Sequence, residues 1–235
     1  FTDSALTGTA ATSVTLTTAA PSCEVWHKWT LTDATWTTVP VGVTKTYDGK
    51  NSAITAVAST SEGVSSTITY QWYRKLTGAG SYDAVAGATA SSINVKDVAD
   101  SGSYYVVATI TIDGVSAQNT SSAVDVAISP IALTVKPANK TITYLAAVPS
   151  SYSLEVVSGA FASGETVSVL GSVDYATNYT AGSNIGSYDI TATIVSNTNY
   201  SLTVNKGVLT VNAKSCNDST VSVTLAQTTF SYDGT

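Results

Sequence analysis

Apolar and polar residues alternate along several segments of the chain, with the period of two that is typical of half-buried β-strands. In one segment Ile68, Tyr70 and Trp72 fall on one face, and the residues between them fall on the other. Asp-Gly pairs and Gly-rich runs, which are typical of tight turns, separate the segments. The pattern predicts strands joined by turns, and it recurs in residues 104–110, 188–194 and 221–225.

No segment of ten or more residues shows the 3.6-residue period of an amphipathic helix. Thr, Val, Tyr and Ile are abundant, whereas the strong helix formers are scarce, which favours strands. A length of 235 residues suits two domains of ordinary size. We therefore expect an all-β fold of two tandem modules, with β-strand extensions at both ends.

The sequence Ile68-Thr69-Tyr70-Gln71-Trp72-Tyr73 is followed, some thirty residues later, by Asp100-Ser101-Gly102-Ser103-Tyr104. These two motifs resemble the tryptophan-bearing strand and the D-x-G-x-Y corner of immunoglobulin-type sandwiches. The resemblance covers residues 43–129, which we expect to form an Ig-like β-sandwich.

The resemblance also implies which residues hold this sandwich together. Trp72 is expected to be the buried core tryptophan, and Tyr104 to be the tyrosine of the corner. The two inter-sheet cysteines of the family are missing, because Val106 occupies one position and a small residue in 56–58 is expected at the other. Packing around Trp72 must then replace the disulfide.

A second ordered set of motifs occupies residues 130–213 and is similar to MBG-type repeats, which occur in tandem in large bacterial surface proteins and adhesins. The resemblance implies a second, small all-β module. One departure is clear, since the family usually has Gly after the tyrosine of its opening motif and here Leu145 follows Tyr144. The motifs are found in residues 131–136, 139–144, 152–154, 164–166, 186–190, 199–200 and 207–211.

The sequence Thr46-Tyr47-Asp48-Gly49-Lys50 resembles the YDG motif of the same surface proteins, and Tyr232-Asp233-Gly234 repeats it about 185 residues later. Two copies indicate a long repeat made of one sandwich and one MBG-like module. We expect residues 1–42 to be an N-terminal β extension or partial domain. Residues 214–235 are expected to be a C-terminal strand or the start of a next module.

The charge balance excludes some partners. Ten basic residues against sixteen acidic ones give a net charge of −6, which does not suit neutralisation of nucleic-acid phosphates. No run of about 18 apolar residues is present, so we expect no membrane span. The chain begins with Phe1 and shows no signal sequence, so we expect a processed protein or a piece of a longer one. Cys23 and Cys216 are a candidate disulfide of an oxidising compartment, within or between chains.

No catalytic or metal-binding constellation stands out. The single histidine, His27, lies among aromatic residues and is not accompanied by a Gly-x-Ser-x-Gly motif. Asp97, Asp100 and Asp113 offer oxygen atoms for calcium, but Asp100 is already accounted for by the corner. We therefore expect no enzyme, no cofactor and no metal. A Lys–Asn isopeptide bond remains open, with candidates Lys136, Lys140, Asn205, Asn212, Glu155 and Glu165.

Three of the four tryptophans, Trp26, Trp29 and Trp36, lie within eleven residues. They could form a platform that stacks on sugar rings, or they could form the small core of the N-terminal segment.

The leading hypothesis is a non-enzymatic structural or adhesive module of an extracellular cell-surface fibre or adhesin. Its terminal segments would pair as β-strands, so that copies join head to tail as a homo-oligomer or filament. The alternative is a carbohydrate-binding module that uses the three tryptophans. A glycan or a host-surface ligand is a possible partner in either case.

Overall fold

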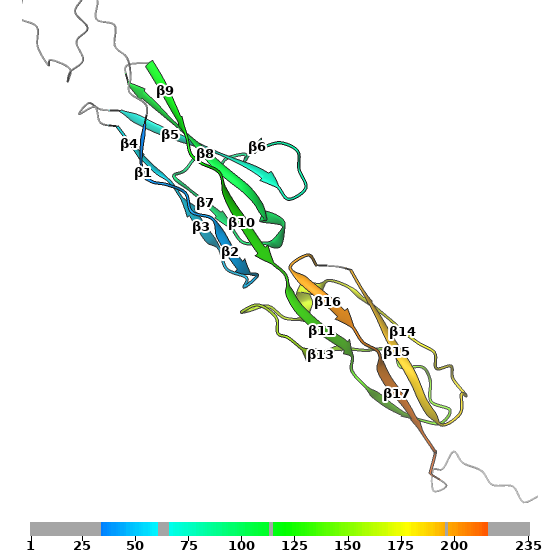
Figure 1. Cartoon of the computed structure of the whole chain (residues 1–235). Helices are drawn as coiled ribbons and strands as arrows, with labels where there is room; N and C mark the ends of the chain where they lie inside the picture. The colour runs from blue at the N-terminus through cyan, green and yellow to red at the C-terminus, as the bar shows by residue number, and fades with distance from the viewer. Residues whose placement is uncertain (1–33, 61–65, 113–114, 196, 216–235) are drawn as a thin grey trace, which may run out of the picture. The chain divides into compact units, whose positions relative to one another are not determined.

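The computed structural model describes residues 34–60, 66–112, 115–195 and 197–215, all within one compact unit, Thr32–Thr235. The described residues are almost entirely β-strands, with two short 3-10 helices, η1 (Val98–Asp100) and η2 (Val167–Leu170). The expected all-β fold is confirmed (Figure 1). None of the helices described is long and apolar enough to cross a membrane.

The first module is a sandwich whose larger sheet has the strand order β2-β10-β8-β5-β6, with β9 also paired to β8. Two antiparallel pairs, β1-β4 and β3-β7, form the other layer. β1 lies ahead of residue 43, where we expected this module to begin, and it pairs with β4 inside the module. The strands are β1 (Thr35–Thr38), β2 (Val43–Thr46), β3 (Ser52–Thr55), β4 (Val57–Ser59), β5 (Thr67–Leu76), β6 (Asp83–Ala84), β7 (Ser92–Val95), β8 (Gly102–Ile112), β9 (Val115–Thr120) and β10 (Val124–Ser129).

The core of the first module surrounds Trp72, which is fully buried and donates its indole N–H to the carbonyl oxygen of Ala90 at 2.9 Å. Val106 and Ala56 belong to the same buried cluster, and the sequence predicts Val106 and a small residue in 56–58 at the cysteine positions of the Ig family. Tyr104 is also buried, and its hydroxyl donates to the carbonyl oxygen of Asp100 at 2.7 Å. This bond to a residue four positions upstream is the geometry of a tyrosine corner.

The second module has two sheets, with the strand orders β13-β11-β16 and β12-β17-β15-β14. A cluster of Tyr179, Ile190, Leu209 and Val211 lies in its core. The strands are β11 (Ile131–Pro137), β12 (Lys140–Thr143), β13 (Leu154–Ser158), β14 (Val173–Thr177), β15 (Gly186–Ile194), β16 (Tyr200–Val204) and β17 (Gly207–Asn212).

Both modules are closed by a parallel pair of an early strand and the last strand. In the first module β2 pairs with β10, and the amide of Tyr47 donates to the carbonyl of Ser129 at 2.8 Å. In the second module β12 pairs with β17, and the amide of Tyr144 donates to the carbonyl of Asn212 at 2.8 Å. Tyr47 and Tyr144 therefore hold equivalent positions, each directly after the early strand of its module.

Candidate functional site

The two modules meet at a joint in which a single residue, Pro130, separates β10 from β11. The backbone is held on both sides of this residue. Before it, the carbonyl of Ser129 accepts the amide of Tyr47, and after it, the amide of Ile131 donates to the carbonyl of Asn199 at 3.0 Å. Proline has no amide hydrogen and a nearly fixed φ, so the connection has little freedom and leaves no donor unpaired.

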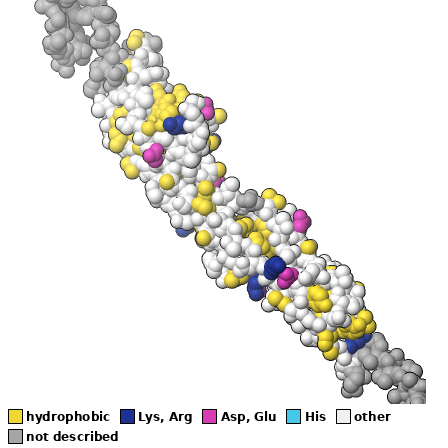
Figure 2. Space-filling model, turned by 45° about the vertical axis from the view of Figure 1, so that its right-hand side comes forward, with side chains coloured by type: hydrophobic (Ala, Val, Ile, Leu, Met, Phe, Trp, Pro, Cys, Tyr) yellow, Lys and Arg dark blue, Asp and Glu magenta, His cyan; other side chains and the backbone are white. Residues whose placement is uncertain are grey.

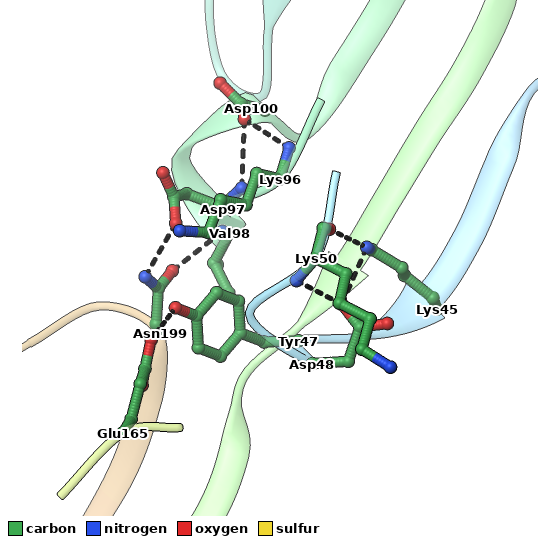
Figure 3. Close-up of polar contacts among 10 residues, drawn as sticks. All are labelled: Lys45, Tyr47, Asp48, Lys50, Lys96, Asp97, Val98, Asp100, Glu165 and Asn199. Atoms are coloured by element: carbon green, nitrogen blue, oxygen red, sulfur yellow. Dashed lines mark hydrogen bonds and ion pairs between the residues drawn. The ribbon is translucent and has the colours of Figure 1, made fainter. Parts of the chain in front are cut away.

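A carboxylate lies at the centre of the joint. The hydroxyl of Tyr47, from the first module, donates to Oε1 of Glu165 in the second at 2.5 Å, as Figure 3 shows. The hydroxyl of Tyr200 donates to Oε2 of the same carboxylate, and it accepts the amide of Ala162 at 2.9 Å. Tyr47 and Tyr200 are 4% and 3% exposed, whereas Glu165 itself is half-buried.

These contacts perturb all three acidic groups in the way expected of hydrogen bonds to a charged acceptor. The hydrogen bonds from Tyr200 and Tyr47 hold the pKa of Glu165 below its usual value. The bond to Glu165, together with burial, raises the pKa of Tyr47. Burial, together with the bond to Glu165, raises the pKa of Tyr200 to about 12. At neutral pH the joint therefore contains one carboxylate and two neutral phenols.

The YDG motif shapes the loop that delivers Tyr47. Oδ1 of Asp48 accepts the amide of Lys50 at 2.9 Å and the ammonium of Lys45 at 2.8 Å, which closes a tight turn. Gly49 has φ of +74°, a left-handed conformation that favours glycine. It also packs against the second module, since a Cβ at this position would lie 3.3 Å from Cβ of Ala162.

Asn199 ties the second module to the corner of the first. Its side-chain NH₂ donates to Oδ1 of Asp97 at 2.9 Å, and its side-chain oxygen accepts the amide of Val98 at 2.9 Å (Figure 3). Asp97 and Val98 begin the 3-10 turn that ends at Asp100, whose carbonyl anchors Tyr104. The Ig-like corner is therefore included in the joint.

Apolar packing continues across the joint. One buried cluster contains residues of the first module, such as Trp72, and residues of the second, such as Leu133 and Leu170. The rings of Tyr47 and Tyr200 meet edge to face, with centroids 5.8 Å apart. Relative motion of the modules would therefore separate both hydrogen-bonded and apolar contacts.

The structure brings together few of the other candidates from the sequence. Trp36 is half-buried and packs against the core cluster of the first module. Trp26, Trp29, His27, Cys23 and Cys216 lie outside the described residues, as does Asp113.

The acidic and basic candidates have other partners. Oδ2 of Asp100 accepts the amides of Lys96 and Asp97, and no cluster of metal-ligating side chains occurs in the described segments of the chain. Lys136 forms an ion pair of 2.9 Å with the partly exposed Glu155, whereas Glu165 lies in the joint. Lys140 lies over the ring of Tyr152.

Sequence reasoning does not predict the joint. Tyr47 stands out in the sequence as a residue of the YDG motif and Glu165 as an isopeptide candidate, but nothing in the sequence connects them. Asn199 lies in an MBG-type motif and in an Asn-Tyr-Ser sequon, and neither feature points to the joint. A cavity of about 470 Å³ in the second module is also missed by the sequence pattern. Its lining includes Val148, Pro149, Tyr152, Tyr175 and Tyr179.

Comparison with known proteins bears on the second module. Residues 133–210 match the family model of the MBG domain (YGX type). The second module is an MBG domain. No curated protein matches the chain.

Several solved structures of multidomain proteins are similar to this chain at low sequence identity. For extracellular domains 3–5 of Drosophila OTK the sequence identity is 15%, with 77% of this chain and 65% of that chain covered and a TM-score of 0.31. For immunoglobulin domains 1–5 of Sidekick-1 the sequence identity is 12%, with 76% of this chain and 38% of that chain covered and a TM-score of 0.31. For Drosophila N-cadherin EC1-4 the sequence identity is 12%, with 76% of this chain and 50% of that chain covered and a TM-score of 0.31. The chain spans less than two thirds of the length of each.

Proposed function

We propose that residues 34–215 form a stiff, non-enzymatic spacer in an extracellular cell-surface fibre or adhesin. The joint carries this proposal, because a one-residue connection, a shared carboxylate and a shared apolar cluster couple an Ig-like module to an MBG domain. The surface agrees with a spacer, since the face in Figure 2 is mostly uncharged, with scattered hydrophobic and few charged side chains. The resemblance of the MBG domain to bacterial surface repeats supports the location.

The test is whether the two modules tumble as one body. In weakly aligned solution, residual dipolar couplings of both modules should fit one alignment tensor in the wild type. Substitution of Asn199→Ala together with Tyr47→Phe should require two tensors, because the two side-chain clamps of the joint are then lost. Asn94→Ala, at an exposed position of β7, is the control and should leave one tensor. Two tensors in the wild type would refute the spacer.

The proposal also includes assembly of several copies of the chain into a fibre. We propose that, in copies not continued by a further module, the part of the N-terminal extension ahead of β1 and residues 214–235 pair as strands between copies, with Cys23 and Cys216 as a disulfide at that contact. Non-reducing gel electrophoresis should show a ladder that collapses in Cys216→Ser. A monomer band without free thiols would mean that the bond closes within one chain, and head-to-tail assembly through it would be wrong.

Carbohydrate binding is the alternative function. It would rest on Trp26, Trp29 and Trp36, of which Trp36 packs against the core cluster. A glycan array combined with titration of tryptophan fluorescence separates the two proposals, since a spacer shows no saturable quenching. Saturable quenching that is lost in Trp36→Ala would favour the carbohydrate-binding module.

A further inference from the structure

The two modules share the construction of one end. At this end of each module the early strand stops, the last strand leaves, and the strand with the tyrosine corner begins. The hydroxyl of Tyr188 donates to the carbonyl of Asn184 at 2.7 Å, four residues upstream, as that of Tyr104 does to Asp100. Both tyrosines follow a Gly-Ser pair, and Gly186 is paired with Val211 of the last strand.

In the first module this end is covered by the second module. Tyr47, which directly follows the early strand, is 4% exposed and bonds to Glu165. The corner turn is covered as well, since Asp97 and Val98 bond to Asn199. This end of the first module is therefore an interface between modules.

The same end of the MBG domain carries exposed apolar side chains. Leu145 follows Tyr144 and is 59% exposed, and Ile185, in the corner turn, is 60% exposed. Strand register places both at the same end, because Thr143 pairs with Asn212 and Gly186 with Val211. Val148, 44% exposed, lies in the loop that Tyr179 ties down through its bond to the carbonyl of Ala146. We call Leu145, Val148 and Ile185 the end patch.

The last strand of the MBG domain is β17 (Figure 1), and the end of this strand pairs with Thr143 and Gly186, which precede and follow Leu145 and Ile185 closely in sequence. The sequence beyond has a pattern already seen in the first module. Residues 220–235 alternate, then end in Tyr-Asp-Gly, as residues 35–50 do, and residues 35–50 form β1, β2 and the YDG turn. Residues 220–235 therefore have the length and motif of the opening of an Ig-like module.

We propose that the end patch is the docking surface for a further β-module that follows the MBG domain in the polypeptide and is opened by residues 220–235. Burial of the end patch would supply the apolar contact of a second joint, in the same way that the second module buries the equivalent end of the first module. The proposal extends the spacer function to a second joint, and it can fail while the first joint stands.

The first experiment uses the 235-residue chain. Leu145→Asn with Ile185→Thr removes most of the patch, and asparagine tolerates the left-handed backbone at position 145. The thermal midpoint of the MBG domain should change by no more than about 2 °C, because the patch serves docking and not folding of the domain. The matched control is Val156→Thr with Val157→Thr, two exposed residues of β13. A fall of more than about 5 °C in the patch variant alone would overturn the proposal.

The second experiment lengthens the chain by a second copy of residues 51–215 placed after Thr235, so that residues 220–235 take the place of 35–50. Amide hydrogen exchange in residues 145–148 and 183–186 should slow at least tenfold relative to the 235-residue chain, and the patch variant should restore the fast rates. Unchanged exchange beside a folded added copy would overturn the proposal. So would failure of the added copy to fold, because residues 220–235 would then not open a module.

Two further measurements distinguish docking of a further module from self-association of the chain and from failure of the first joint. Sedimentation of the 235-residue chain should show no self-association that depends on the patch; such self-association would assign the patch to a second copy of the chain and overturn the chosen partner. Exchange protection at Val98, whose amide donates to the side-chain oxygen of Asn199, reports the first joint in the same samples. Loss of protection there would refute the spacer, whereas loss at the end patch alone would refute only the second joint.

Discussion

Substitution of Glu165 by alanine should destabilise the module that does not contain it. Glu165 belongs to the MBG domain, but it accepts the hydroxyl of Tyr47 from the Ig-like module. Its removal leaves a buried phenol without that acceptor, which costs about 1–3 kcal/mol. Glu165 itself is half-buried and water can reach some of the gap, so we expect about 1–2 kcal/mol for the first module.

Tryptophan emission can report this effect, because all four tryptophans lie at or before residue 72 and none lies in the MBG domain. With a urea m-value of about 1–2 kcal/mol/M for a module of this size, the tryptophan-detected midpoint should fall by about 1 M. Glu155→Ala is the control, since Glu155 forms an exposed ion pair with Lys136 within the MBG domain and should shift that midpoint hardly at all.

A double-mutant cycle with Tyr47→Phe isolates the contact itself. Phenylalanine keeps the ring that packs against Tyr200 and removes only the hydroxyl. The two substitutions should be non-additive by about 1 kcal/mol or more. If Glu165→Ala leaves the tryptophan-detected midpoint unchanged, the carboxylate does not couple the modules and the reasoning is refuted.

Further predictions concern single positions. Trp72→Ala should lower the free energy of unfolding of the first module by about 3–5 kcal/mol. The cooperative unfolding transition of this module, followed by circular dichroism, should then disappear, and an unchanged transition would contradict the sandwich core. Leu145→Gly should stabilise the MBG domain by about 0.5–1 kcal/mol in calorimetry, since relief of a left-handed conformation worth about 1–2 kcal/mol exceeds the entropic cost of glycine of about 0.5–1 kcal/mol; a loss of stability would contradict the strain at φ of 67°. The joint should weaken in acid, because folding lowers the pKa of Glu165. Glu165 therefore stabilises the folded joint fully above its ordinary pKa of 4.5, and this contribution is lost as the pH falls through the lowered pKa. The joint should also weaken in base, because Tyr200 stabilises it fully below its ordinary pKa of 10 and loses that contribution as the pH rises through about 12. A pH titration of the chemical shifts of joint residues should show both limits. Glu165→Ala should remove the acid limit.

Much of the fold could be predicted because its signals are local. The alternation around Trp72 and the spacing from Asp100 to Tyr104 each span a few residues, and side-chain direction in a strand follows directly from such spacing. The missing glycine after Tyr144 is likewise visible in the sequence. The structure supplies its meaning, since Leu145 holds a positive φ that glycine would hold without strain.

The joint could not be predicted because its partners are far apart in sequence and polar. Tyr47 and Glu165 are separated by 118 residues, and Val98 and Asn199 by 101. Period-two patterns report which residues face a core, and they carry no information on which carboxylate meets which phenol. The same limit applies to Trp36, because proximity to other tryptophans in sequence does not decide whether a side chain faces solvent or the core.

The parallel closing strands have a consequence for mechanical load. Four residue pairs join β2 to β10, and four join β12 to β17. In the first module, a pulling force that enters near β2 and leaves through β10 acts along their ladder. In the second module the force enters through β11, which is itself paired in parallel with β16, and leaves through β17. All rungs of a parallel ladder are then sheared together, whereas the rungs of an antiparallel hairpin pulled from its open end would break in succession. Rupture of each module therefore requires several hydrogen bonds to fail at once, and Pro130 passes the tension from one sheared ladder directly to the next module.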